Sequence, residues 1–202
     1  MRSFMRAALT AVLIAALAGC ASFGSDEPQR YYVLEVAAAS ATGTATPRAT
    51  AVLVAPTTAP SFYETQEIVY SRAPGQRGYY QFHAWTDRPG RRLTELLVQR
   101  LERAGLFKAV ATAVSGVQGS LVLNTHLAEF YHDAATAPGS VKVTITAELM
   151  DSTQRVLLAR RTFERSAPAA TYDAPGAVRA FGSAVTAALD DIAQWVDASA
   201  PR

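Results

Sequence analysis

The feature that most constrains the fold is the strict alternation of apolar and polar residues from Val141 to Leu149. Valine, isoleucine, alanine and leucine take every second position, and lysine, threonine and glutamate take the positions between them. Because successive side chains of a strand point to opposite faces, this pattern predicts a strand with one buried and one solvated face. Turn signals at 138–139 and 151–152 separate it from two further expected strands, 120–131 and 155–165. The first should be central, since it begins with apolar residues on both faces, and the arginines of the second indicate a sheet edge or a solvated face.

The N-terminal half of the chain has shorter β-prone runs, bounded by proline and glycine. We expect strands over 30–36, 51–55, 67–70 and 79–83, and an extended segment over 106–110. Pro74, Gly75 and Gly78 indicate a hairpin turn between the third and fourth of these strands.

Two segments have the apolar spacing of amphipathic helices. The first opens with Asp87 as the expected N-cap and ends at Gly105, a candidate left-handed residue. The second opens with Asp173 and carries an apolar stripe to Val196. Hairpin-linked strands together with helices that each have one apolar face predict an α+β fold. We expect a single two-layer domain with a mainly antiparallel sheet and both amphipathic helices on one face.

The N-terminus has the organisation of a bacterial lipoprotein precursor. Arg2 and Arg6 precede an apolar run over 7–18, which is too short to span a bilayer. The sequence Leu-Ala-Gly-Cys at 17–20 resembles the lipobox, and the alternative is an ordinary signal peptide that contains a cysteine. The resemblance implies cleavage before Cys20 and acylation of that residue, and Ala21 after it points to the outer membrane. We therefore expect a signal peptide over 1–19, a lipidated cysteine and tether over 20–30, a domain over 31–196 and a tail over 197–202.

Composition argues against several classes of function. The signal segment holds two basic and no acidic residues, so the mature chain has 17 of each sign and no basic run, which is unsuited to nucleic acid. Its single cysteine precludes an internal disulfide. His126 and His132 lie about 20 Å apart if their segment is extended, too far to share a metal ion. No nucleophile elbow, phosphate loop or dinucleotide fingerprint is present, so we expect no enzymatic activity, no metal and no cofactor.

Aromatic residues are concentrated in one part of the chain. Seven of the 18 aromatic residues fall between positions 62 and 85. Tyrosine and tryptophan are enriched at interfaces, so one interpretation is a binding face for a protein or a lipid. The other is that these residues are core and rim of the sheet. The candidate partner-facing residues are Phe62, Tyr63, Tyr70, Tyr79, Tyr80 and Trp85.

Several short motifs together resemble one known family. They are Tyr-Tyr-Val-Leu at 31–34 after the lipobox, Val-Ala-Pro at 54–56, Ile-Val-Tyr at 68–70, Trp-Thr-Asp-Arg-Pro at 85–89, Leu-Glu-Arg-Ala-Gly-Leu-Phe at 101–107, Phe-Tyr-His-Asp at 130–133 and Ile-Ala-Gln-Trp-Val at 192–196. Their order is similar to that of the ABC-type transport auxiliary lipoproteins, which include paraquat-inducible protein C. Thr86 departs from the alanine expected after the tryptophan, and the stretch 37–49 has no counterpart.

The resemblance implies a non-catalytic accessory of a phospholipid or hydrophobic-solute transport system. Such a lipoprotein would be held in the outer membrane by its acyl chains, face the periplasm, and dock the periplasmic MCE-domain protein of an ABC transporter. Two alternatives remain: a carrier that binds phospholipid in an apolar pocket between sheet and helices, and a structural envelope lipoprotein without a transport role. The alanine-rich flank of the last helix permits close packing and favours docking over a carrier.

Overall fold

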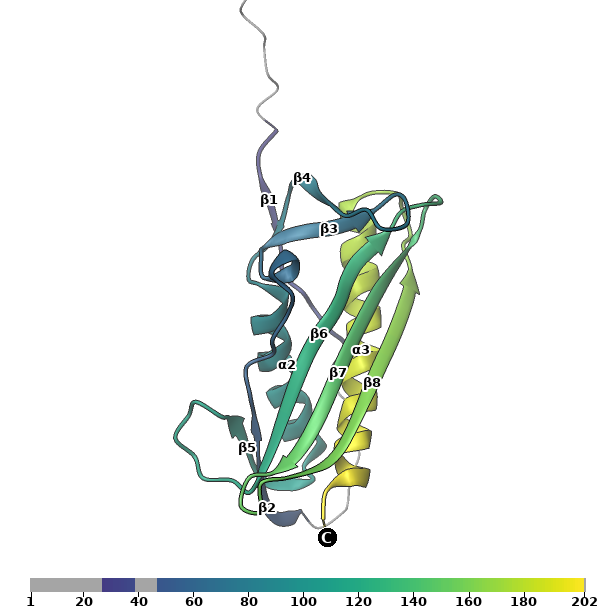
Figure 1. Cartoon of the computed structure of the whole chain (residues 1–202). Helices are drawn as coiled ribbons and strands as arrows, with labels where there is room; N and C mark the ends of the chain where they lie inside the picture. Colours follow the sequence, from purple (N-terminus) through teal and green to yellow (C-terminus); the bar gives the residue numbers. More distant parts are fainter. Residues whose placement is uncertain (1–26, 39–46, 202) are drawn as a thin grey trace, which may run out of the picture.

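The computed structural model describes residues 27–38 and 47–201 (Figure 1). The expected signal peptide, Cys20 and most of the tether lie outside these residues. The elements, in chain order, are β1 (Arg30–Tyr32), β2 (Arg48–Val54), the 3-10 turn η1 (Ser61–Tyr63), β3 (Glu67–Ser71), β4 (Gly78–Trp85), α2 (Pro89–Ala104), β5 (Phe107–Thr112), β6 (Leu121–Asp133), β7 (Ser140–Asp151), β8 (Val156–Pro168) and α3 (Ala174–Ser199).

One half of the sheet is a long antiparallel ladder. β6 pairs with β7 along its whole length, and β7 pairs in the same way with β8. β7 has the expected alternation of burial, with Val141, Val143, Ile145, Ala147 and Leu149 all buried. β6 is central and β8 is an edge strand, as predicted.

The other half of the sheet contains short parallel pairings, so the sheet is mixed. The start of β6 pairs in parallel with β2, which pairs in parallel with β5. The end of β6 pairs in parallel with β3. β3 and β4 form the expected antiparallel hairpin, and β1 joins β4 in parallel. The fold is α+β, as predicted, and these pairings add parallel connections to a sheet whose long ladders are antiparallel.

α2 and α3 both cover one face of the sheet (Figure 1). The expected leucines of α2 are buried, as is the whole expected stripe of α3 except Val178, which is partly buried. Between helices and sheet the rings of Trp85, Phe130 and Phe181 pack together, with the two phenylalanine centroids 4.2 Å apart. The buried alanines of α3 let the helix approach the sheet closely (Ala177, Ala180, Ala184 and Ala188).

Residues 33–38, which follow β1, run as a strap between the two helices. The expected strand over 30–36 thus ends at Tyr32. Leu34 is buried, and its carbonyl accepts a hydrogen bond from Arg92 Nε at 3.2 Å. The backbone of Ala37 accepts from Arg100 at 2.7 Å and donates to Thr186 Oγ1 at 3.0 Å. Side chains of both helices therefore hold the strap by its backbone.

The ends of the helices differ in part from expectation. Asp173 caps α3, since its carboxylate accepts from Gly176 N at 2.7 Å, and Gly105 has the expected left-handed conformation at the end of α2. The prediction of Asp87 as N-cap is wrong. The N-cap is Arg88, and Asp87 instead accepts from Arg88 N and pairs with Arg91. α3 continues to Ser199, past the expected start of the tail, because Asp197 pairs with Arg48.

Candidate docking surface

The aromatic residues between 62 and 85 lie at the end of the sheet where the N-terminal tether enters the fold (Figure 1). β1 brings the chain to this end and pairs with β4. The hairpin of β3 and β4 carries four of the six candidate residues, Tyr70, Tyr79, Tyr80 and Trp85, and η1 carries Phe62 and Tyr63. The structure therefore brings the six residues into neighbouring elements.

Two of the six candidates are buried. Trp85 is 2% exposed and packs against Phe130 and Phe181, so it belongs to the core. Tyr63 is 7% exposed. The expectation that Trp85 faces a partner does not fit, because its ring packs between the sheet and α3. Tyr63 is nearly buried, and what remains accessible of it lines the groove described below. The other four are partly exposed.

Phe62 and Tyr79 form a stacked pair on the surface beside η1. Their ring centroids are 4.6 Å apart with an interplanar angle of 13°. The Tyr79 hydroxyl donates to the Phe62 carbonyl at 3.3 Å. Burial raises the pKa of Tyr79, with a contribution from Glu67, which keeps the hydroxyl protonated as this hydrogen bond requires. The pair holds η1 against the hairpin and leaves part of both rings accessible.

Tyr80 contacts a different set of rings. It packs against Tyr70 and stacks with His132, with centroid distances of 4.8 and 6.2 Å. Its hydroxyl lies 2.7 Å from His132 Nδ1. Burial raises the pKa of Tyr80 to about 12, so the hydroxyl keeps its proton.

His132 is fully buried and its hydrogen bonds define its tautomer. Nε2 lies 2.9 Å from the Pro138 carbonyl, which can only accept, so Nε2 carries the proton. Nδ1 then accepts the hydrogen bond from Tyr80. Burial lowers the pKa of His132, although the Pro138 carbonyl, Asp133 and Asp173 oppose this shift. The imidazole is therefore a neutral structural group that joins β6 to β4.

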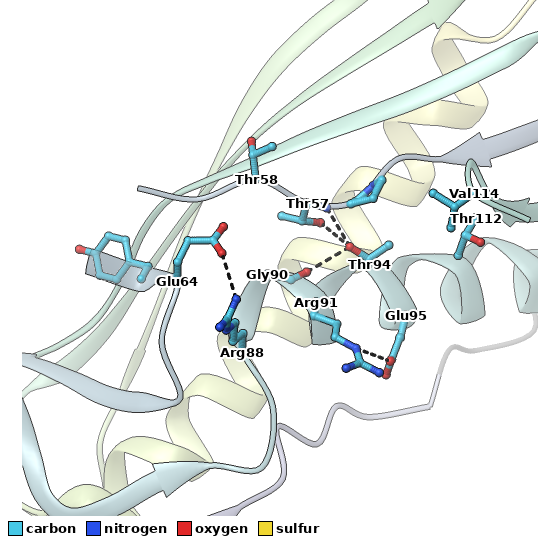
Figure 2. A pocket seen from close by; sticks show the side chains of 12 residues that line it. Thr57, Thr58, Glu64, Arg88, Gly90, Arg91, Thr94, Glu95, Thr112 and Val114 are labelled. Carbon is cyan, nitrogen blue, oxygen red and sulfur yellow. Dashed lines mark hydrogen bonds and ion pairs between the residues drawn. The ribbon is translucent and has the colours of Figure 1, made fainter. Parts of the chain in front are cut away.

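A surface groove of about 510 Å³ runs along the start of α2 (Figure 2). Pro56, Tyr63 and Val114 give it apolar surface, and Val114 is 78% exposed at its far end. Its remaining lining includes four threonines and a charged rim (Thr57, Thr58, Thr94, Thr112, Glu64, Arg88, Arg91 and Glu95). It thus combines an apolar floor with charges of both signs at its edge.

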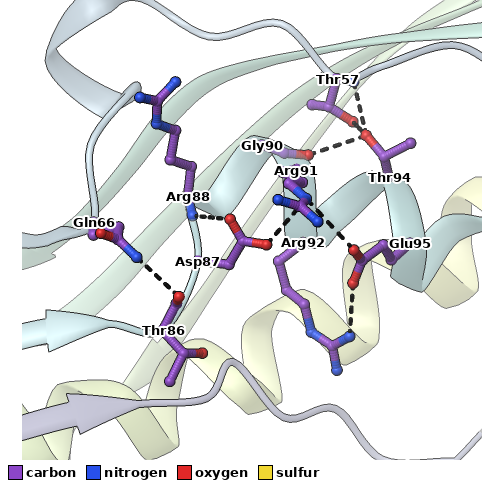
Figure 3. A network of polar contacts seen from close by, with 10 residues as sticks. All are labelled: Thr57, Gln66, Thr86, Asp87, Arg88, Gly90, Arg91, Arg92, Thr94 and Glu95. Carbon is purple, nitrogen blue, oxygen red and sulfur yellow. Dashed lines mark hydrogen bonds and ion pairs between the residues drawn. The ribbon is translucent and has the colours of Figure 1, made fainter.

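The wall of the groove is a fixed polar network (Figure 3). Thr94 Oγ1 accepts from Thr57 N at 2.8 Å and lies 3.1 Å from the Gly90 carbonyl. Gly90 permits this approach, because a Cβ there would lie 3.0 Å from the Thr57 carbonyl. The residues before β3 are therefore held rigidly on the first turns of α2.

The rim of the groove carries alternating charges. Arg91 lies 3.2 Å from Asp87 and 3.7 Å from Glu95, and Arg88 lies 3.9 Å from Glu64. The side chains of Arg88 and Arg91 are more than half exposed, so water screens these pairs and they add little stability. The two guanidinium groups remain available to carboxylates of a partner.

Sequence reasoning missed this groove and some exposed apolar residues. The groove joins residues 56–64, the start of α2 and the end of β5, which are far apart in sequence, and no local pattern connects them. Exposed apolar side chains also occur at Tyr31, Val33 and Tyr172 at the tether end, and at Val156 and Leu157 at the opposite end. The exposure of Tyr31 and Val33 could have been anticipated from the sequence, because both are apolar residues that closely follow the polar tether.

Two further features bear on what this surface can do. Within 27–38 and 47–201, no cluster of three or more histidine, cysteine or acidic residues could hold a metal ion. None of the helices in the same residues combines the length and the apolar character needed to span a membrane.

Comparison with solved structures supports the architecture. A DUF330 protein from Xanthomonas campestris matches with a TM-score of 0.76 and 22% identity, over 84% of this chain and 96% of that chain. An uncharacterized protein matches with a TM-score of 0.67 and 16% identity, over 84% and 99% of the two chains. At these identities the likeness concerns the fold alone. Among curated proteins no match was found.

The fold and its surface define a compact α+β domain that offers a rigid groove. Residues 32–193 match the ABC-type transport auxiliary lipoprotein component family. The chain belongs to this family, as the resemblance of its motifs predicted. It is therefore an auxiliary lipoprotein of a transport system, and such a protein is anchored to a membrane.

Proposed function

We propose that the protein is a non-catalytic accessory of an ABC-type, MCE-associated transport system for phospholipid or another hydrophobic solute. Anchored through Cys20 in the outer membrane and facing the periplasm, it docks the periplasmic MCE-domain protein. The observation that carries the proposal is the family match over residues 32–193. Docking requires a surface and no reactive group, and the groove along α2 provides such a surface.

We assign the docking site to the groove and the adjoining Phe62–Tyr79 pair. The apolar lining of the groove accepts an aliphatic or aromatic side chain of the partner. The charged rim favours partner residues of opposite charge around that side chain. Tyr63, which lines the groove, and Phe62, on the surface, belong to the same turn, so the groove and the aromatic pair form one rigid surface. Preorganisation of this kind lowers the entropic cost of association.

Photo-crosslinking in the native cell tests this assignment. Probes are placed at Glu64 and Arg91 on the rim, and a matched probe is placed at Gln194, which is exposed on α3. We expect the rim probes to crosslink to the MCE-domain protein and the Gln194 probe to give no such product. Equal crosslinking from all three positions, or none from the rim, would overturn the docking site.

The groove also favours a second function, binding of a phospholipid acyl chain. Its volume is in the range of small-ligand sites, and Arg88 and Arg91 at its rim are suited to a phosphate. The space between sheet and helices, where a carrier was expected to have its lipid pocket, is filled by packed rings. The groove is therefore the place where an acyl chain could bind. Mass spectrometry of the purified protein tests it. A carrier would retain phospholipid, and an Arg88→Glu/Arg91→Glu variant would lose it.

A further inference from the structure

The tether limits how the domain can stand on its membrane. It runs from Cys20 to Gln29, ten residues that span at most about 36 Å when fully extended. The chain enters the fold at Arg30, which pairs with His83 at one end of the sheet. β6 has 13 residues and is about 43 Å long, so the opposite end of the sheet lies farther from Arg30 than the tether reaches. The end bearing β1 is therefore confined to within about 36 Å of the bilayer, whereas the opposite end can lie farther away.

Exposed apolar side chains lie at this end. Tyr31 is 62% exposed, Val33 is 48% exposed and Tyr172, in the loop before α3, is 46% exposed. Tyrosine suits the boundary between lipid and water, because its ring is apolar and its hydroxyl is polar. Tyr31 and Val33 follow the tether directly, so they cannot move away from the membrane independently of it.

A row of rings makes this end rigid. It runs from Tyr32 through His83, Tyr80 and His132 to Tyr172, with successive centroids 5.7, 6.4, 6.2 and 6.3 Å apart. The Tyr172 hydroxyl donates to the Ala134 carbonyl at 2.7 Å. The row connects β1, β4, β6 and the loop before α3 across the end of the domain. Tyr31, which neighbours the first ring of the row, and Tyr172, which is its last ring, are therefore held in fixed positions relative to each other.

Two arginines at this end also suit a phospholipid surface. Arg72 is exposed beside the Tyr70 ring, with its guanidinium carbon 5.0 Å from the ring centroid. Within the described part of the chain, neither Arg72 nor Arg179 at the start of α3 has a carboxylate within 4.0 Å. Both are free to approach lipid phosphates.

We propose that the tether end of the domain is a second membrane contact, in which Tyr31, Val33 and Tyr172 rest in the headgroup region of the bilayer. The acyl anchor recruits the protein, and this contact fixes its orientation. The axis of the sheet then points away from the membrane, and the end bearing Val156 and Leu157 projects into the aqueous space. The proposal rests on acylation of Cys20, and it does not depend on the identity of the docking partner.

Spin labels in the full-length lipidated protein test the orientation. The protein is reconstituted in vesicles of phosphatidylethanolamine and phosphatidylglycerol, and acylation is checked by mass spectrometry. With Cys20 acylated, an introduced cysteine is the only free thiol. One label is placed at Thr136, exposed in the turn beside Tyr172, and another at Leu157 at the opposite end.

We expect the label at Thr136 to lose most of its accessibility to an aqueous nickel reagent on reconstitution, and the label at Leu157 to lose none. Tyr31→Ser/Tyr172→Ser should restore access at Thr136, whereas the matched change Val117→Ser/Val156→Ser, at two exposed valines outside the groove, should not. A urea unfolding curve confirms that each variant is folded. Equal access at both labels, no effect of the tyrosine changes, or an unacylated Cys20 would overturn the proposal. Because the vesicles contain no protein partner, failure of docking would not affect the result.

Discussion

At the scale of single residues, burial of a neutral imidazole makes the stability of the domain depend on pH. Burial lowers the pKa of His132 below its ordinary value of 6.5. The unfolded chain therefore binds a proton at a pH where the folded chain does not. The contribution of His132 is fully present above its ordinary pKa, falls as the pH drops through 6.5, and levels off below the folded pKa.

We expect the free energy of unfolding to fall between about pH 7.5 and 5.5, the range in which histidine titrates. Urea unfolding at several pH values measures this, with His132→Gln as the comparison. Glutamine preserves a donor and an acceptor but does not titrate. The variant should show a shallower dependence on pH in this range. An identical slope in the two proteins would contradict the assignment to His132.

The Tyr80 hydroxyl should contribute more to stability than the neighbouring Tyr79 hydroxyl. Tyr80→Phe leaves Nδ1 of the buried His132 without a donor and should cost about 1–3 kcal/mol, as for an unsatisfied buried acceptor. Tyr79→Phe removes a longer bond, of 3.3 Å, to a partly exposed site and should cost less. Urea unfolding at neutral pH compares the two. Equal losses would contradict the structural role of the Tyr80–His132 pair.

The structural role of a residue could be predicted from the sequence mainly where its contacts are local. Asp173 as N-cap and Gly105 as helix terminator depend on their own backbone neighbours and were confirmed, whereas Asp87, also predicted from a local pattern, lies one residue before the N-cap Arg88. Trp85 depends on where β4 meets Phe130 and Phe181, which are 45 and more residues away. The aromatic cluster could thus be found from sequence, but its division into core and surface could not.

At the scale of elements, the strap shows how a short segment is held by close packing. A Cβ built on Gly182 of α3 would lie 2.6 Å from the Glu35 carbonyl, which is closer than packed atoms approach. Alanine in a helix interior is ordinarily favoured over glycine by about 1 kcal/mol. Here the backbone of the strap occupies the space that the methyl group needs.

Gly182→Ala should therefore loosen the strap despite the higher helix propensity of alanine. We expect faster limited proteolysis between residues 33 and 38, with the remainder of the domain still protected. Ser183→Ala, at the exposed neighbouring position, is the matched control and should leave the cleavage rate unchanged. A more stable Gly182→Ala protein with an uncleaved strap would contradict this packing.

Periodicity predicted most elements because it reports which face of a segment is buried. β7 and both helices lie close to where the pattern placed them, although β7 and β4 extend beyond their predicted bounds and β2 begins three residues earlier than predicted. The parallel pairings of β2 with β5 and β6 depend on contacts between distant segments, and hydrophobic patterns do not record pairing direction. The strap was expected as strand because its residues are β-prone, whereas its backbone bonds go to helix side chains.

At the scale of the whole molecule, the proposed membrane contact and the proposed docking groove lie in different parts of one domain. The tether enters beside β1, and the groove lies along α2 between η1 and Val114. A partner bound in the groove would contact the flank of the domain, while the tether end remains against the bilayer. The expected aromatic face is thus divided, with Phe62 and Tyr79 beside the groove and Tyr80 in the row of rings.

The most direct test of the account is the affinity of the purified lipoprotein for the periplasmic MCE-domain protein, measured by surface plasmon resonance. Arg88→Glu/Arg91→Glu reverses the rim charge without touching the core, and Arg103→Glu/Arg155→Glu, at two exposed positions outside the groove, is the charge-matched control. We predict at least about tenfold weaker binding for the rim variant, corresponding to about 1.4 kcal/mol, and unchanged binding for the control. Unchanged affinity of the rim variant, or an equal loss in both, would contradict docking through the groove.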